Sequence, residues 1–281
     1  QLYQSAVGSL MYLVTGTRPD LAFPVGAASR FLTKPTEHQW KGIIHIMRYL
    51  QGTSSQALVL GGATSLRLEG YSDADWGAND EARRSISGYA FLYGEGAVSW
   101  SSKRQASPAV SSAEAEYMAL ARATKEAVWL QALVGELNGV TCGTIPIGVD
   151  NSSCIAMAKN PESHERTKHI DIQYHLIRHH VGLKRVEVHH CPTEEMLADI
   201  LTKSLPKLKQ DFCLQGLGVH NRPSQTVLST SLGSTKGDIV GKGDLVAGAG
   251  PRRGNIVKAA GSSRTNLVEV GGNLVEVEDT E

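Results

Sequence analysis

Several features are missing from this chain of 281 residues, and each absence removes a class of protein. No apolar run approaches the roughly 20 residues of a membrane-spanning helix, and no signal peptide is seen, so no membrane partner is expected. The four cysteines contain no CxxC pair, which favours a reduced intracellular protein without structural zinc. Lys plus Arg equals Asp plus Glu at 28 each, which argues against a polybasic nucleic-acid binder but not against local basic patches.

Aromatic residues stop at Phe212, and the chain changes character soon afterwards. The remainder is rich in Gly, Ser, Thr and Val, and NLVEV occurs twice, at 266–270 and 273–277. Such a segment has too little bulky apolar material for a core. We therefore expect residues 219–281 to form a low-complexity tail that is disordered or makes at most a weak hairpin.

The start of the chain, residues 1–55, has the pattern of consecutive helices. Pro19 and Asp20 are typical of a helix start, and Gly52 is typical of a helix end. The chain is 41% hydrophobic and 20% charged, which is enough for one sizeable core with an appendage. An all-helical segment is therefore predicted ahead of a larger domain.

An acidic residue opens the buried face of a predicted long helix. The helix begins near Ser111 or Ser112 as N-cap, and steps of four and three from Glu116 meet only apolar residues: Leu120, Ala123, Ala127, Leu130 and Val134. Glu114 lies about 200° away around the helix. A buried carboxylate costs several kcal/mol unless it is paired or binds a cation. The alternative is a first-turn Glu at the positive helix end, still partly in water.

Two aspartates lie at the ends of predicted strands. Residues 66–73 alternate as in a half-buried strand, so Asp73 and Asp75 share one face. Asp150 closes a second alternating segment and is followed by cap residues and a short helix. The carboxyl ends of strands are where α/β sheets place ligands. A loop or capping role stays open for each aspartate.

Asp199 has less support from its surroundings. The apolar positions around it are Met196, Leu197, Ile200 and Leu201, and Asp199 does not belong to their face. Periodicity alone predicts a solvated acid on a helix.

A series of short motifs in one order runs through residues 1–218. They are SAVGSLMYL, TRPDLAF, SRFLTKPTEHQWK, YSDADWGAND, RRSISGYAFLYGEGAVSWSSKRQ, SSAEAEYMAL, VDNSSCIAMAKNP, RTKHIDIQYHLIR and PTEEMLADILTKSL. Together they closely resemble the end of a copia-type LTR-retrotransposon Pol polyprotein. The resemblance implies a reverse-transcriptase remnant (thumb or connection) over residues 1–55. It implies a ribonuclease H domain over 64–218, an α/β fold with a five-stranded mixed sheet flanked by helices.

The resemblance also assigns a function and a catalytic quartet. Enzymes of this family cut the RNA strand of RNA/DNA hybrids with two Mg²⁺ ions, for which Mn²⁺ is an acceptable substitute. The residues that match the motifs are Asp73, Glu116, Asp150 and Asp199. The resemblance thus chooses Asp73 over Asp75 and Glu116 over Glu114, and it adds Asp199, which spacing does not support.

Several basic residues are candidates for contact with a nucleic-acid backbone. Two pairs flank adjacent predicted strands, and two more precede a predicted helix: Arg83, Arg84, Lys103, Arg104, Arg166 and Lys168. Ordinary solvated surface charge is the alternative for each. His190 lies near the place of a mobile histidine in cellular ribonucleases H, although the end of a strand with packing and solvent roles is favoured for it.

The resemblance names partners and leaves two alternatives open. The partners are an RNA/DNA hybrid and the upstream polymerase domain of the same polyprotein, in a cytoplasmic retroelement particle; the paired-Asp polymerase motif is absent from this chain. An integrase or transposase is disfavoured because Glu116 precedes Asp150, whereas those enzymes carry their Glu after both aspartates. A catalytically silent remnant that only binds nucleic acid is the other alternative.

Overall fold

The computed structural model of the chain describes residues 1–61, 66–77, 83–139, 142–159, 168–221, 266–270 and 273–277. For residues 168–174 and the last two ranges it describes the backbone only. The chain divides into two units, residues 1–226 and 227–281, and each is described by itself.

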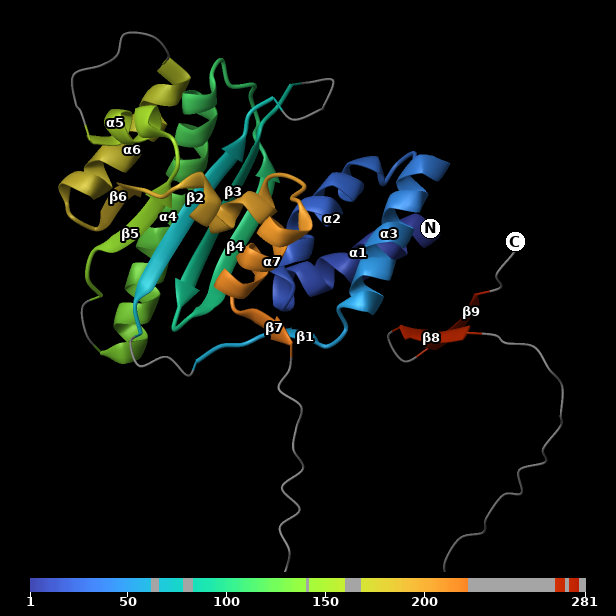
Figure 1. Cartoon of the computed structure of the whole chain (residues 1–281). Helices are drawn as coiled ribbons and strands as arrows, with labels where there is room; N and C mark the ends of the chain where they lie inside the picture. Colours follow the sequence, from blue (N-terminus) through green and yellow to red (C-terminus); the bar gives the residue numbers. More distant parts are fainter. Residues whose placement is uncertain are drawn as a thin grey trace, which may run out of the picture. The chain divides into compact units, whose positions relative to one another are not determined.

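Five strands of the first unit form a mixed sheet in the order β4-β3-β2-β5-β6 (Figure 1). Their bounds are β2 Leu68–Asp75, β3 Ile86–Tyr93, β4 Gly96–Arg104, β5 Ile145–Val149 and β6 Val186–His190. The first three are antiparallel neighbours, whereas β5 runs parallel to β2 and β6 parallel to β5. The predicted five-stranded mixed sheet is confirmed, and β2 begins and ends two residues later than the predicted segment 66–73.

Helices cover one face of this sheet: α4 Ser112–Asn138, α5 Ser152–Lys159 and α6 Lys168–Gly182 (Figure 1). Phe91 of β3 and Ile147 of β5 pack there against Leu120 of α4 and Ile177 of α6. Neighbouring side chains on a strand point to opposite faces. Ala90 and Leu92 accordingly belong to a second hydrophobic cluster on the other side.

The N-terminal helices supply most of that second cluster. They are α1 Leu2–Gly16, η1 Pro19–Leu21, α2 Ala22–Ala28, η2 Ser29–Phe31 and α3 Glu37–Gly52, as the sequence predicts for residues 1–55. Leu10 of α1 and Ile43 of α3 are buried with Leu92 of β3. The short helix η4 Leu197–Leu201 and the helix α7 Lys207–Gly216 contribute Leu201 and Leu214 to the same cluster. The sheet therefore lies between two apolar layers.

Two further strands connect the start of the domain with its end. β1 Gln56–Leu58 pairs antiparallel with β7 Val219–Asn221, and the Val59 amide donates to the Gly218 carbonyl at 2.8 Å. The described fold therefore continues to Asn221, three residues into the predicted tail. The predicted boundary between the helical segment and the sheet domain stays a prediction.

The second unit is described only at the repeated NLVEV segments. β8 Asn266–Val270 pairs antiparallel with β9 Asn273–Val277, which is the hairpin expected from the sequence as the alternative to disorder. The rest of the predicted tail beyond Asn221 lies outside the described residues. In the part of the chain that the structure describes, no helix has the length and apolar character needed to span a bilayer.

Candidate metal site

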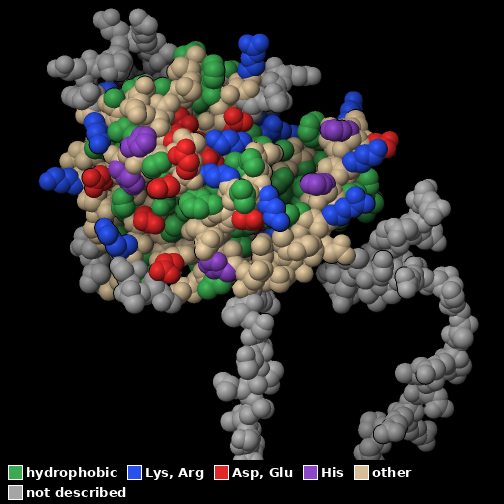
Figure 2. All heavy atoms as spheres, in the orientation of Figure 1, with side chains coloured by type: hydrophobic (Ala, Val, Ile, Leu, Met, Phe, Trp, Pro, Cys, Tyr) green, Lys and Arg blue, Asp and Glu red, His purple; other side chains and the backbone are tan. Residues whose placement is uncertain are grey.

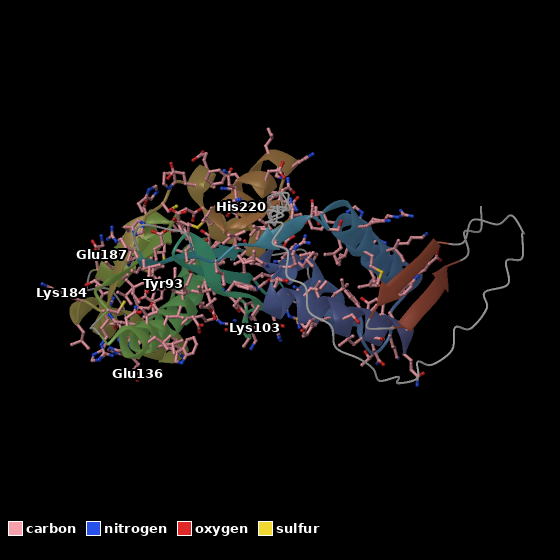
Figure 3. All side chains as sticks on the ribbon, turned by 90° about the horizontal axis from the view of Figure 1, so that it is seen from below. Tyr93, Lys103, Glu136, Lys184, Glu187 and His220 are labelled. Atoms are coloured by element: carbon pink, nitrogen blue, oxygen red, sulfur yellow. The ribbon has the colours of Figure 1, made fainter. Side chains whose placement is uncertain are left out.

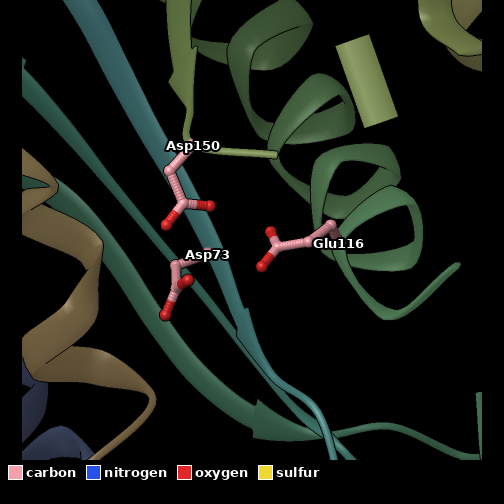
Figure 4. Close-up of side chains that lie close together, drawn as sticks. All are labelled: Asp73, Glu116 and Asp150. Atoms are coloured by element: carbon pink, nitrogen blue, oxygen red, sulfur yellow. The ribbon is translucent and has the colours of Figure 1, made fainter. Parts of the chain in front are cut away.

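Three carboxylates gather at the carboxyl end of the central strands. Asp73 comes from β2, Glu116 from the first turns of α4, and Asp150 directly follows β5 (Figure 4). Each offers an oxygen, and these oxygens lie within 4.8 Å of one another. We call these residues the carboxylate triad. Among the described residues, they form the group of His, Cys, Asp and Glu side chains with the spacing of a metal site.

The start of α4 explains why Glu116 faces the triad and Glu114 does not. The Ser111 side chain caps the helix by accepting from the Glu114 amide at 3.2 Å, as predicted. The Glu114 carboxylate accepts from the Val110 amide at 2.7 Å and is thereby held beside the cap. Glu116, only 5% exposed, leads the buried face that continues through Leu120. The solvated alternative for Glu116 is therefore wrong.

The parallel pairing of β2 with β5 brings Asp73 and Asp150 together. Gly70 pairs with Ile147, and continuing this register places Asp73 beside Asp150. The capping role is taken by Asn151, whose side chain accepts from the Cys154 amide at 3.0 Å. The capping alternative for Asp150 is therefore wrong.

Asp199 lies beside the triad rather than in it. It is 2% exposed, so the solvated position that periodicity predicts is wrong. The reason is that η4 is a 3₁₀ helix whose five residues are all buried, and its turns do not follow the 3.6-residue period. The Asp199 carboxylate pairs with Lys203 at 2.8 Å and Lys209 at 3.5 Å.

Close packing of η4 on β3 brings this segment to Asp73. Gly88 is the β3 partner of Asp73. A Cβ atom on Gly88 would lie 2.6 Å from Thr202 Cγ2 and 2.9 Å from Leu201 Cβ. The hydroxyl of Thr202 donates to the Asp73 carboxylate. The missing side chain at position 88 therefore allows this hydrogen bond.

We predict that Gly88→Ala displaces the segment 198–202 from the sheet. Overpacking of this kind costs about 1–3 kcal/mol of unfolding free energy. We expect Mn²⁺ binding to weaken as well, because Thr202 and Asp199 move relative to Asp73. Urea denaturation and Mn²⁺ titration measure the two effects. Gly143→Ala is the matched control, since nothing lies within 4 Å of its new Cβ; equal effects in both variants would contradict the prediction.

The electrostatics of the triad favour a bound cation. Burial, opposed by Lys203 and strengthened by Asp199, raises the pKa of Asp73 to about 6. Burial, followed by the charges of Asp73 and Asp150, raises the pKa of Glu116 to about 10. Glu116 Oε2 is buried without a hydrogen-bond donor among the described residues. Carboxylate oxygens are the hard ligands that Mg²⁺ and Mn²⁺ bind, and one of the three carboxylates has an oxygen without a donor among the described residues, so the residues present fit such an ion.

Four of the predicted nucleic-acid contacts lie at the same end of the sheet as the triad. Ile86 pairs with both Asp75 and Arg104, so the β3–β4 hairpin brings Arg83, Arg84, Lys103 and Arg104 to that end. Arg84 is half-buried and the other three are exposed; Figure 3 shows Lys103 projecting from β4. Arg166 lies outside the described residues, as does the side chain of Lys168 at the start of α6. Contact with nucleic acid stays a prediction for all six.

His190 is the exposed last residue of β6, as the strand prediction implies, and it pairs with Val149 next to Asp150. Any catalytic role for it stays a prediction.

Sequence reasoning missed four residues that contact the acidic groups: Thr193, whose hydroxyl donates to Asp150 at 3.1 Å, with Thr202, Lys203 and Lys209. The i, i+4 spacing of Asp199 and Lys203 was the available signal.

Comparisons with known proteins place the chain in a family. No protein-family model matches it. It is 42% identical over 219 residues to the retrovirus-related Pol polyprotein from transposon TNT 1-94 of Nicotiana tabacum, covering 78% of this chain and 16% of that protein. It is 38% identical over 222 residues to the Pol polyprotein from transposon RE1 of Arabidopsis thaliana, covering 79% and 15%.

Among solved structures, LC11-RNase H1, isolated from compost by a metagenomic approach, matches with a TM-score of 0.38 and 19% identity, over 49% of this chain and 94% of that one. The chain spans about one sixth of the length of the curated relatives. In both relatives more than a third of the aligned residues are identical to those of this chain, and the alignments cover more than three quarters of it. The chain belongs to the retrovirus-related Pol polyproteins of copia-type transposons.

Proposed function

We propose that this chain is a ribonuclease H that hydrolyses the RNA strand of RNA/DNA hybrids during reverse transcription of the retrotransposon. The observation that carries the proposal is the carboxylate triad, with oxygens within 4.8 Å at the carboxyl ends of β2 and β5. Its order along the chain, Asp73, Glu116 and Asp150, is that of the ribonuclease H motifs. Membership in the Pol polyprotein family supports the same function.

The site has ligands for two divalent ions. Asp73, Glu116 and Asp150 would hold one, while Asp199, which shares Lys203 with Asp73, would join Asp73 in holding a second. Bound Mg²⁺ supplies Lewis acidity at the scissile phosphate and lowers the pKa of the attacking water. The protein's own contribution is orientation: the hydroxyls of Thr202 and Thr193 fix the carboxylates of Asp73 and Asp150.

Basic residues near the triad would position the substrate. Arg83, Lys103 and Arg104 are exposed at the triad's end of the β3–β4 hairpin, and contacts to phosphates set the register of a bound duplex. Contacts to 2′-hydroxyls on one strand would distinguish a hybrid from duplex DNA. The upstream polymerase domain of the polyprotein is the proposed partner, in a cytoplasmic retroelement particle.

End-labelled duplexes test this function. We expect the purified chain with Mg²⁺ to degrade the RNA strand of an RNA/DNA hybrid, leaving 3′-hydroxyl and 5′-phosphate ends. Duplex DNA of the same sequence, and hybrid with chelator, serve as controls and should stay intact. Hybrid binding without cleavage by the folded chain would contradict an active nuclease and favour the silent remnant. Strand-transfer products would instead indicate an integrase.

A further inference from the structure

A lysine side chain bridges two of the four acidic residues. Lys203 Nζ lies 2.8 Å from Asp199 Oδ1 and 3.7 Å from Asp73 Oδ2. The side chains of the two aspartates are 3% and 2% exposed, whereas that of Lys203 is 35% exposed. Its ammonium group therefore meets two buried anions from the solvent side. Figure 2 shows acidic and basic side chains next to one another in the middle of this face of the protein.

Asp199 has a second lysine, which holds it in a different way. Lys209 Nζ lies 3.5 Å from Asp199 Oδ2, but it also donates to the carbonyls of Thr193 and Glu194 at 2.7 and 2.6 Å. These bonds tie the Lys209 side chain of α7 to the segment before η4. Among the ion pairs of the described residues, only that of Lys203 reaches both Asp199 and Asp73. Lys203 and Lys209 thus differ in a property that can be tested.

The position of Lys203 is the one that a cation shared by Asp73 and Asp199 would need. An ammonium group and a metal ion compete for the same carboxylate oxygens, and each repels the other. A lysine ammonium can be displaced by a metal ion, because it lies at the end of a flexible side chain and is strongly hydrated when it moves into water. The partial exposure of Lys203 leaves that route open.

We propose that Lys203 is the resident cation of this site. In the metal-free protein its ammonium keeps Asp199 beside Asp73, and it opposes the ion that these two carboxylates share until it withdraws to solvent. Lys203 is thus a positioning residue that sets the affinity for the second ion. The proposal rests on the function proposed above, because it assumes that Asp73 and Asp199 bind metal.

Mn²⁺ binding to the full chain without nucleic acid tests the proposal. Bound and free Mn²⁺ are counted by electron paramagnetic resonance in the original protein and in Lys203→Met, Lys203→Arg and Lys209→Met. In the original protein the ammonium must leave two carboxylates before the second ion binds, so removing this competition should tighten the binding of that ion at least about tenfold. We expect this gain for the weaker Mn²⁺ site of Lys203→Met, no gain for Lys203→Arg, and a smaller change for Lys209→Met.

A second measurement uses the unmutated side chain, in case Lys203→Met does not fold. Lysines labelled with ¹³C-methyl groups keep their charge, and Lys203→Arg identifies the signal of Lys203. We expect this signal to shift during a Mg²⁺ titration with the midpoint of the weaker site. The proposal would be overturned if the Lys203 signal did not shift on addition of Mg²⁺, or if Mn²⁺ binding were unchanged in Lys203→Met. Either result would leave the metal site itself intact. Absence of Mn²⁺ binding in every protein would overturn the proposed function as well.

Discussion

Asp73→Asn is expected to abolish hybrid cleavage and at the same time to stabilise the metal-free protein at pH 8. Asp73 contributes to both proposed ion positions. It belongs to the triad, and it shares Lys203 with Asp199, with which it would hold the second ion. Electrostatic stabilisation by a bound metal is worth several kcal/mol in the transition state, which corresponds to about a thousandfold in rate. The loss should therefore be about 10³-fold or more.

The stability gain follows from the sign of the pKa shift. Burial raises the pKa of Asp73 from 3.8 to about 6 in the folded state, so the folded protein holds this proton more tightly than the unfolded chain. The stabilising contribution is complete below about pH 4 and is lost as the pH rises through 6. At pH 8 the ionised group thus costs on the order of 1–3 kcal/mol, and the neutral Asn side chain avoids this cost.

Urea denaturation with chelator at pH 4 and pH 8 measures the stability difference, and hybrid cleavage measures the activity. Asp75→Asn is the matched control, because Asp75 lies on the same face of β2 and is partly exposed. Its cleavage rate should stay within about tenfold of the original, as for surface changes outside the reacting groups. If Asp73→Asn cleaved the hybrid near the original rate, Asp73 would not be a catalytic residue. Loss of activity together with loss of stability at pH 8 would indicate a structural role instead.

A divalent ion is expected to stabilise the protein strongly at high pH and weakly at low pH. Burial and the charges of Asp73 and Asp150 raise the pKa of Glu116 to about 10, so this group is protonated in the metal-free protein at neutral pH. Its contribution to stability is complete below about pH 4.5 and is lost as the pH rises through 10. Mg²⁺ must displace this proton, and below pH 6 also that of Asp73.

The expected dependence is steep. The apparent Mg²⁺ affinity should rise about tenfold per pH unit between 6 and 10, where one proton is displaced, and faster below 6, where two are displaced. An ion at 100 times its dissociation constant adds about 2.7 kcal/mol of stability, which corresponds to about 5–10 °C in Tm for a unit of this size. Thermal melts with and without Mg²⁺ at pH 5.5, 7 and 8.5 measure the effect.

Two variants separate the triad from other causes of this pH dependence. Glu116→Gln should remove most of the Mg²⁺ stabilisation at pH 8.5, because it removes one ligand of the triad. Glu114→Gln should retain it, since Glu114 bonds to the Val110 amide beside the helix cap. Equal stabilisation at all three pH values, or in Glu116→Gln, would show that Mg²⁺ binds elsewhere.

Local patterns in the sequence were sufficient for the elements that carry the triad. The buried face of α4, from Glu116 through Leu120 to Leu130, follows from the 3.6-residue period. The alternation in β2 and the cap residues after β5 placed Asp73 and Asp150 at strand ends. These features depend on residues within one or two turns of each other, so they can be read along the chain. The motif resemblance added Asp199 as a site residue and identified the family. The comparison with known proteins confirms the family.

What the sequence by itself determined is therefore the set of elements, the strand-end carboxylates and the family. The tertiary structure decided which of the four acids converge: Asp73, Glu116 and Asp150 meet, while Asp199 pairs with two lysines. It also decided that Thr202 reaches Asp73, 129 residues away along the chain, over the bare backbone of Gly88. Such contacts depend on sheet register and close packing between distant segments, and no local periodicity carries that information.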